Sequence, residues 1–293
     1  MGSVLSRPAY AKINLHLAVG LPYEDGYHPI QSLFALVDLC DTISLSWEER
    51  DRFSIEVTGL EQYCKQGDDT LTKAAMLWQE ASGFPVSLSV HCEKRIPVKA
   101  GLGGGSSDAA VLLSLLQSLS AAHALDVPTL SAVALKVGSD VPFFLSNQPM
   151  ALVCSRGEHI VPVTAKPLEV LLVMPNFFDI STSDAYRALD AQRRGGALVR
   201  SLSDADLMEI YTKPSHQWKG MLYNDFQPCS GNEAFYGSLQ RLSDRYKGYG
   251  SMSGSGACWF FVSEDASEVH SLHAAIQGLF AERVRCWITH ILA

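Results

Sequence analysis

Three consecutive glycines followed by two serines form the segment of this chain best suited to holding an anion. Gly103 to Gly105 precede Ser106 and Ser107, and a leucine-rich apolar run begins at Asp108. Glycine reaches positive φ angles and lets a ligand approach the backbone closely. Because the free N–H groups and the dipole of a helix N-terminus favour negative charge, the arrangement predicts a phosphate-binding loop. The serines can cap the helix, donate to phosphate oxygens, or do both. The predicted loop comprises Pro97, Val98, Lys99, Ala100, Gly101, Leu102, Gly103, Gly104, Gly105, Ser106 and Ser107.

Three well-known nucleotide loops do not fit this segment. A Walker loop ends in Gly-Lys-Ser/Thr, whereas Gly105 is followed directly by two serines. The dinucleotide fingerprint, counted from Gly101 and Gly103, requires a third glycine where Ser106 stands. A protein-kinase glycine loop precedes a lysine-bearing strand, but here a helical pattern follows. A flexible linker is disfavoured because apolar segments adjoin the loop on both sides.

Strand-like and helical patterns interleave unevenly along the chain and predict the elements that carry this loop. Alternating apolar and polar residues indicate strands, and apolar residues at spacings of three and four indicate helices. The predicted strands are 9–18, 34–46, 53–58, 86–92, those within 152–173, 257–262 and 284–290; the predicted helices are 71–81, 108–119, 128–138, 222–245 and 269–280. Residues 188–219 are predicted to form surface helices or a variable insertion. This order predicts an α+β fold of two subdomains divided near Pro162.

The composition argues against several functional classes. The 293 residues carry a net charge of −8, which disfavours a nucleic-acid surface. No apolar run reaches the roughly 20 residues that span a bilayer. The seven cysteines are an odd number without a C-x-x-C pair, as in a reducing cytoplasm, where we expect this protein. Gly2 and Ser6 match a loose myristoylation pattern, but no polybasic stretch follows, and a chance match or cloning remnant is the alternative.

Three motifs in sequence order resemble those of the GHMP kinases, the superfamily of galactokinase, homoserine kinase and mevalonate kinase. Ala11-Lys-Ile-Asn-Leu15 resembles the first motif, the glycine loop the second, and Gly250-Ser-Met-Ser-Gly-Ser-Gly-Ala257 the third. The resemblance implies a GHMP-kinase fold with the active site in the cleft between an N-terminal ATP-binding domain, 1–161, and a C-terminal substrate-side domain, 162–293.

Further segments resemble one branch of these kinases, which phosphorylates the 2-hydroxyl of a cytidine-diphosphate-linked alcohol in the non-mevalonate route to isoprenoid precursors. They are Asp25-Gly-Tyr-His28, Gln31-Ser-Leu-Phe34, Gly138-Ser-Asp-Val-Pro-Phe-Phe144 and Leu222-Tyr-Asn-Asp-Phe226. The resemblance fades over residues 188–219.

The resemblance implies Asp140 as the general base that takes the proton of the substrate hydroxyl; without it, helix capping is an equal alternative. Lys12 lies among apolar strand residues, where an unpaired ammonium is costly, and its natural partner is Asp140. The implied donor is ATP, whose phosphates the loop amides hold with Mg²⁺ bridging them. Ser107 and Asp108 are candidates for a protein ligand of the metal, and neither is assigned. Lys99 either touches a phosphate or is exposed.

For the acceptor, the resemblance implies that Tyr27 stacks on the cytidine and that His28 reads the edge of the base. Tyr186 forms the opposite face of this sandwich or is an ordinary core tyrosine. Asn14 shares a strand face with Lys12 and can hydrogen-bond the substrate, as can Asp140.

The implied partner is a small CDP-linked molecule, not a nucleic acid or a membrane, and the oligomeric state stays open between a monomer and a weak dimer. A GHMP kinase for another alcohol such as homoserine is disfavoured by Tyr27 and His28. A non-catalytic GHMP-like binding protein is disfavoured by the presence of Lys12 and Asp140.

Overall fold

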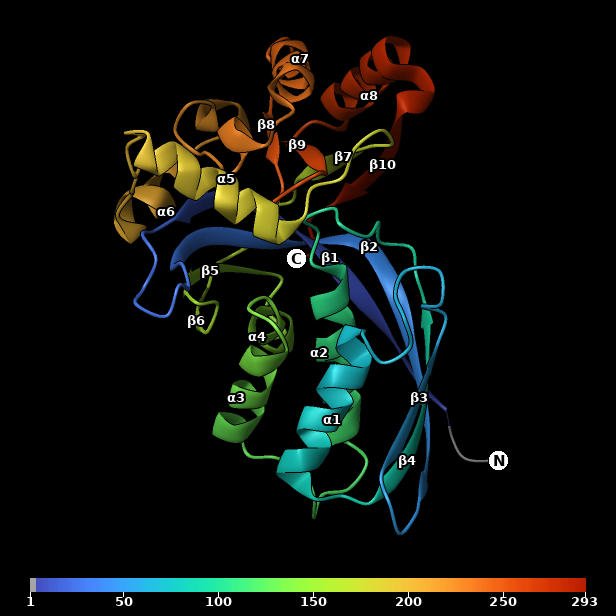
Figure 1. Ribbon diagram of the computed structural model, residues 1–293. Coiled ribbons are helices and arrows are strands. Elements are labelled where there is room, and N and C mark those ends of the chain that lie inside the picture. The colour runs from blue at the N-terminus through green and yellow to red at the C-terminus, as the bar shows by residue number, and fades with distance from the viewer. Residues whose placement is uncertain (1–3) are drawn as a thin grey trace.

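A computed structural model describes residues 4–293 of the chain as two β-sheets with helices packed around them (Figure 1). The strands of the first sheet have the order β3-β4-β2-β5-β6, and β1 pairs with β2. The second sheet has the order β10-β7-β9-β8. The α+β prediction is confirmed, and Gly2 lies outside the described residues. The strands are β1 (Leu5–Val19), β2 (Ile30–Glu49), β3 (Ser54–Thr58), β4 (Val86–Glu93), β5 (Met150–Ser155), β6 (His159–Pro162), β7 (Glu169–Pro175), β8 (Tyr249–Met252), β9 (Trp259–Ser263) and β10 (Val284–His290).

The long hairpin of β1 and β2 is the central element of the fold. The two strands pair antiparallel from Leu5 with Leu45 to Val19 with Ile30, and β2 also pairs with β4 and β5. Successive side chains of a strand point to opposite faces, so Lys12 and Asn14 share one face of β1. The apolar side chains between and beyond them enter the core. Both faces of β1 are therefore buried from Ala11 to Val19, one with polar groups such as Lys12 and Asn14 and the other with apolar side chains.

The helices of the first half pack together against the first sheet. They are α1 (Thr70–Ser82), α2 (Gly104–Gln117), α3 (Val127–Val137) and α4 (Val141–Leu145). The prediction that α2 begins at Asp108 was wrong, because the helix starts four residues earlier, at Gly104. Gly103 is its N-cap with a φ of 72°, and no side chain caps the helix. Ser106 and Ser107 therefore lie in the first turn, and their predicted capping role was wrong.

The helices of the second half lie on the other side of β1 and β2 in Figure 1. They are α5 (Thr182–Arg194), α6 (Asp204–Thr212), α7 (Glu233–Ser243) and α8 (Ala266–Phe280), with the 3₁₀ turns Ser215–Trp218, Gln227–Cys229 and Ala281–Arg283. Ile13 and Leu15 of β1 belong to one apolar core with Leu171 and Phe260 of the second sheet. The two halves thus share a core across β1. The domain limits 1–161 and 162–293 stay a prediction. No helix within residues 4–293 is long and apolar enough to cross a membrane.

The predicted helix over 222–245 forms only over Glu233–Ser243. Ahead of it the Asn224 side chain accepts the N–H of Phe226 at 2.9 Å, which competes with helical backbone bonding. Residues 223–225 instead run beside the end of β1. Leu17 donates to Tyr223 O at 2.8 Å and accepts from Asp225 N at 3.0 Å. Residues 249–252, for which no element was predicted, form the strand β8.

Candidate active site

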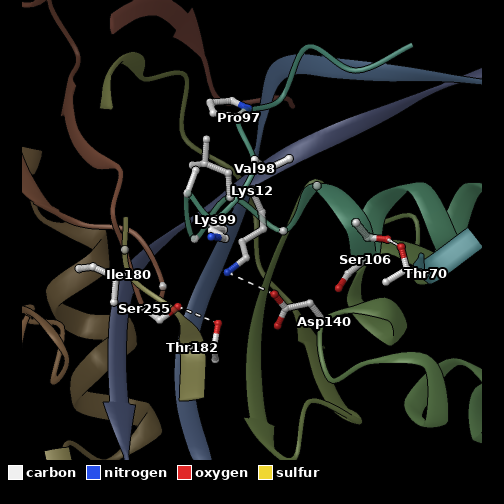
Figure 2. A pocket seen from close by; sticks show the side chains of 18 of the residues that line it. Lys12, Thr70, Pro97, Val98, Lys99, Ser106, Asp140, Ile180, Thr182 and Ser255 are labelled. Atoms are coloured by element: carbon white, nitrogen blue, oxygen red, sulfur yellow. Dashed lines mark hydrogen bonds and ion pairs between the residues drawn. The ribbon is translucent and has the colours of Figure 1, made fainter. Parts of the chain in front are cut away.

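A cavity of about 600 Å³ lies where the glycine loop, β1, α4 and α5 meet (Figure 2). It is lined by the predicted site residues Lys12, Asn14, Asp140, Tyr186 and every loop residue from Pro97 to Ser106. Ser107 is 1% exposed and is not among the lining residues, nor are Tyr27 and His28. The structure therefore brings most of the predicted site together around one cavity.

The glycine loop is held on both sides by backbone hydrogen bonds. Leu102 O accepts from Lys12 N of β1 at 2.9 Å. On the opposite side Lys99 O and Ala100 O accept from the amides of residues 257 and 258, each at 3.1 Å. Gly101 O accepts from the Ser253 hydroxyl at 3.0 Å. The second and third glycine motifs therefore form one continuous wall, although about 150 residues separate them in sequence.

Replacing Gly101 by alanine is expected to lower the free energy of unfolding more than the same change at Gly231. The two glycines have φ angles of 71° and 72°, a region that costs other residues about 1–2 kcal/mol. At position 101 an added Cβ would lie 2.0 Å from Ser253 O, whereas at position 231 nothing lies within 4 Å. We expect the clash to add about 1–3 kcal/mol. Urea unfolding of both variants measures this, and equal losses would contradict the close approach.

The first turn of α2 forms the floor of the cavity beside this wall. The first N–H groups of a helix have no intrahelical partner, and Gly104, Gly105 and Ser106 all line the cavity. Thr70 at the start of α1 donates its hydroxyl to Gly105 O at 2.8 Å and so fixes the turn (Figure 2). Free amides and the helix dipole together make this turn suited to phosphate groups. We call the loop and this turn, residues 97–107, the cradle.

A buried ion cluster supports the cradle from below. Lys94 Nζ lies 2.8 Å from Asp108 Oδ2 and also contacts Asp41. Asp41 in turn accepts the N–H of Ile96 at 2.8 Å, just before the loop begins. Burial raises the pKa of Asp108 to about 7, against the opposing effect of Lys94. The cluster ties the end of β4, the start of the loop and the first turns of α2 together.

Lys12 and Asp140 form the predicted pair on the cavity wall, and Figure 2 shows their side chains pointing toward one another. Lys12 Nζ lies 3.4 Å from Asp140 Oδ2 and 2.6 Å from Asn14 Oδ1. It also lies 4.5 Å above the Phe34 ring. Asp140 precedes α4 but makes no capping bond, so the alternative that its side chain is a helix cap is not supported. An ammonium and a carboxylate beside a phosphate cradle suit proton abstraction from a hydroxyl group.

Aromatic side chains gather at the end of the cavity beyond Asp140. The Tyr186 ring centroid lies 5.1 Å from that of His28 and 4.9 Å from that of Phe226. Tyr27 Oη lies 2.9 Å from the hydroxyl of Ser139, the neighbour of Asp140. Burial raises the pKa of Tyr186 to about 12, with smaller effects from Asp140 and Tyr27. Tyr27 and His28 thus lie beside the cavity, where Tyr27 contacts Ser139 and His28 contacts the cavity residue Tyr186.

Several residues of the site were missed from the sequence. The cation–π contact of Phe34 with Lys12 has no local signal. Asn224 donates to Met252 O at 2.7 Å and to Gly254 O at 2.8 Å, which shapes the third glycine turn. Two adjacent polar residues at 224 and 225 within an apolar stretch were the available signal for it. Thr182 at the start of α5 lies 3.1 Å from the Ser255 hydroxyl, hydroxyl to hydroxyl (Figure 2).

Lys99 lies at the mouth of the cavity. Its Nζ is 2.6 Å from Asp179 Oδ2, and the two side chains are 61% and 59% exposed. An exposed pair of this kind contributes about 0–1 kcal/mol. Lys99 is therefore both exposed and part of the cavity lining, and both predicted alternatives remain compatible with its position.

The chain is similar to kinases of one superfamily. The family model for the GHMP kinases N terminal domain matches residues 69–148. A protein of Anaeromyxobacter dehalogenans (strain 2CP-C) described as 4-diphosphocytidyl-2-C-methyl-D-erythritol kinase is 37% identical over 279 residues, which cover 92% of this chain and 84% of that protein. A protein of Treponema pallidum (strain Nichols) with the same description is 33% identical over 301 residues and 98% of both chains.

Solved structures agree with these similarities. A crystal structure of 4-(cytidine 5'-diphospho)-2C-methyl-D-erythritol kinase matches 99% of this chain and 100% of its own, with a TM-score of 0.75 and 30% identity. Homoserine kinase from Cytophaga hutchinsonii matches 98% of this chain with a TM-score of 0.67 but only 15% identity, which shows a shared fold alone.

Proposed function

The chain belongs to the 4-diphosphocytidyl-2-C-methyl-D-erythritol kinase family of GHMP kinases, and from this membership we propose that it phosphorylates the 2-hydroxyl of 4-diphosphocytidyl-2-C-methyl-D-erythritol. The phosphoryl donor is ATP. It is a small-molecule kinase, and the reaction belongs to the non-mevalonate synthesis of isoprenoid precursors. Homoserine kinase shares the fold at low identity, so the choice of acceptor depends on the cavity and not on the architecture.

The observation that carries this proposal is the pair of Lys12 and Asp140, 3.4 Å apart on the wall of the cavity that the cradle also lines. A phosphoryl transfer to an alcohol requires a donor phosphate and an acceptor hydroxyl held together, with a group to receive the proton. The cradle meets the first requirement and Asp140 the last. Lys12 joins them, because its backbone N–H bonds the loop and its ammonium contacts Asp140.

In the proposed reaction Asp140 accepts the proton of the 2-hydroxyl as the hydroxyl oxygen forms its bond to the γ-phosphorus. The bond from that phosphorus to the β-phosphate oxygen breaks, and ADP leaves. Lys12 offsets the negative charge that develops near the acceptor oxygen. The amides of the cradle and the start of α2 bind the donor phosphates. Asn14, fixed by its bonds to Lys12 and Ser32, is proposed to orient the acceptor.

Mg²⁺ is proposed to accompany the ATP phosphates. Within residues 4–293 no group of three His, Cys, Asp or Glu side chains forms a protein metal site. Magnesium in kinases keeps several waters and uses few protein ligands besides the phosphates, so such a cage is not required. The Ser106 hydroxyl lines the cavity at the cradle and is an oxygen ligand of the right type. The ion supplies charge neutralisation on the phosphates.

The cytidine is proposed to bind where Tyr27, His28 and Tyr186 gather. Tyr186 lines the cavity, and its ring contacts both His28 and Phe226. This aromatic end adjoins Asp140 through the bond of Tyr27 to Ser139, which suits an acceptor whose nucleotide tail extends away from the reacting hydroxyl. Residues of both halves of the chain contribute to this end, so we propose that the predicted domains 1–161 and 162–293 bind substrate jointly.

A panel of alcohols tests the proposed function. Formation of ADP is measured with the CDP-linked methylerythritol, with homoserine, with mevalonate and without an acceptor, each with ATP and Mg²⁺. We expect rapid ADP formation with the CDP-linked alcohol alone and its loss on addition of EDTA. Faster turnover of homoserine would support a GHMP kinase for another alcohol. ATP binding without turnover of any alcohol would support a non-catalytic GHMP-like binding protein.

Replacing Tyr186 by alanine is expected to raise KM for the CDP-linked alcohol while KM for ATP stays the same. Stacking of a base on an aromatic ring contributes about 1–3 kcal/mol, which corresponds to roughly 5–150-fold in affinity. Steady-state kinetics with each substrate varied in turn measure the two constants. Tyr186→Phe keeps the ring and serves as the control. An unchanged acceptor KM in Tyr186→Ala would contradict the stacking and would support the alternative that Tyr186 is an ordinary core tyrosine.

A further inference from the structure

The loop between β1 and β2 carries Tyr27 and His28 but has little packing of its own. Leu21, Tyr23 and Tyr27 are 63%, 43% and 47% exposed. A loop this exposed needs anchors from elsewhere if His28, which is 7% exposed, is to keep a fixed position. Besides the bond of Tyr27 to Ser139 and the ion pair of Asp25 with Arg156, the anchors come from α5 and from Asp225. Asp190 and Arg193 of α5 lie in the part of the chain in which the family resemblance fades.

Arg193, near the end of α5, forms hydrogen bonds with the backbone at the start of this loop. Its guanidinium donates to Gly20 O at 2.9 Å and also to Val19 O. Asp225 completes the arrangement, because its Oδ2 accepts the Val19 N–H at 2.9 Å and lies 3.3 Å from Arg193. Both side chains are buried, 7% and 6% exposed. Together they bond the last backbone groups of β1 where strand pairing ends.

Gly20 O links the Arg193 contact to His28. The same carbonyl that accepts from Arg193 lies 3.0 Å from His28 Nδ1. Because a carbonyl oxygen only accepts, the hydrogen of this bond is on Nδ1. The other ring nitrogen, Nε2, lies 3.5 Å from Asp190 Oδ2. The His28 ring is therefore held at Nδ1 through the loop backbone, and the Asp190 carboxylate of α5 lies beside Nε2, where it attracts the protonated ring.

Tyr186, Asp190 and Arg193 follow one another at helical spacings of four and three residues, so they lie on one face of α5. That face meets the end of β1 and the loop beyond it, and α5 is seen beside the hairpin in Figure 1. The first of the three contacts the His28 ring, the second its Nε2, and the third the carbonyl on its Nδ1.

We propose that Arg193 and Asp190 are positioning residues for the acceptor, which fasten the loop of residues 20–29 to α5 so that His28 is held in place for the nucleotide end of the substrate. This inference rests on the proposed function for the identity of the acceptor. It gives the first part of residues 188–219 a role in acceptor binding, with no contact to the reacting atoms.

Arg193→Lys and Asp190→Asn test the proposal. Lysine keeps the charge beside Asp225 but lacks the planar fork that reaches two carbonyls. We expect KM for the CDP-linked alcohol to rise about tenfold to a hundredfold in Arg193→Lys, because hydrogen bonds from a charged group are lost. Asp190→Asn is expected to raise it about twofold to tenfold, since one partner loses its charge. KM for ATP and kcat are expected to stay at the wild-type values. Asp190→Glu keeps the negative charge, so its acceptor KM is expected to lie between those of the wild type and Asp190→Asn.

Arg194→Lys is the matched control, because Arg194 is the exposed neighbour of Arg193 on the same helix. Its acceptor KM is expected to equal that of the wild type. A rise in both KM values together with a lower unfolding midpoint in Arg193→Lys would indicate general destabilisation and overturn the proposal. An unchanged acceptor KM in both Arg193→Lys and Asp190→Asn would also overturn the proposal. Asp190→Asn is included because Asp190 is partly exposed, so that its replacement is expected to leave the core intact.

Hydrogen exchange separates this inference from the proposed function. In Arg193→Lys the amides of residues 19–29 are expected to exchange faster than in the wild type, while those of the cradle, 97–107, are unchanged. This measurement requires no substrate, so it tests the fastening of the loop even if the wild type turns over no CDP-linked alcohol. Equal exchange of residues 19–29 in both proteins would overturn the fastening, whereas absence of wild-type turnover would overturn the proposed function instead.

Discussion

Asp140→Asn is expected to lower kcat about 10²–10⁴-fold, the usual contribution of a positioned general base. Asparagine has nearly the same shape as aspartate but does not accept the proton of the acceptor hydroxyl. KM for ATP is expected to stay the same, since the donor phosphates bind at the cradle. The free energy of unfolding is expected to fall, because the buried Lys12 ammonium loses its carboxylate partner and keeps only its bond to Asn14. Initial rates at saturating concentrations of both substrates measure kcat.

Asp51→Asn provides the control for this substitution, because Asp51 is an exposed residue between β2 and β3. It carries the same change of charge and is expected to keep the wild-type rate. A kcat for Asp140→Asn equal to that of the wild type would remove Asp140 from the role of base. The chemistry would then depend on the positioning of the two substrates and on Lys12.

Lys12→Met is expected to lower kcat about 10²–10³-fold, comparable to removal of one group that stabilises transition-state charge. Methionine fills a similar volume but lacks the ammonium that lies between Asn14, Asp140 and the Phe34 ring. The Lys12 side chain is 4% exposed, and its loss leaves the buried Asn14 oxygen without a donor, whereas Asp140, which is 27% exposed, stays in contact with water. Stability is therefore expected to fall only slightly while activity falls strongly.

Thermal unfolding and steady-state rates are both needed for this variant. A slightly lower unfolding midpoint, combined with the stated loss of kcat, is the predicted result. Lys136→Met, at an exposed position of α3, controls for the loss of one lysine and is expected to be fully active. If Lys12→Met lost stability in proportion to activity, Lys12 would be a structural residue of the hairpin.

The parts of the site that depend on local sequence were predictable. Alternation along β1 predicted that Lys12 and Asn14 share a face, and they are hydrogen-bonded there. The cost of an unpaired ammonium among apolar residues predicted a partner for Lys12, and Asp140 lies beside it. The leucine spacing predicted α2, although its start was missed because glycine has weak helix propensity and the left-handed Gly103 has no local signal.

The parts that depend on distant contacts were not predictable from a single sequence. The first part of the helix predicted over 222–245 does not form, because Asn224 bonds Met252 O and Gly254 O and because Asp225 bonds the end of β1. The hold of Arg193 on Gly20 joins residues 173 positions apart. In each case a polar side chain satisfies backbone groups of another segment, and helical periodicity carries no information about that partner.

This cavity is proposed to transfer the γ-phosphoryl group of ATP to one hydroxyl of a CDP-linked alcohol. ³¹P NMR of the products formed from 4-diphosphocytidyl-2-C-methyl-D-erythritol and ATP tests it most directly. The predicted result is one new phosphomonoester signal that grows in step with ADP. Its phosphorus–carbon coupling places the phosphate on the 2-carbon of the methylerythritol. Appearance of ADP with inorganic phosphate alone, or of a phosphomonoester at another hydroxyl, would contradict the account.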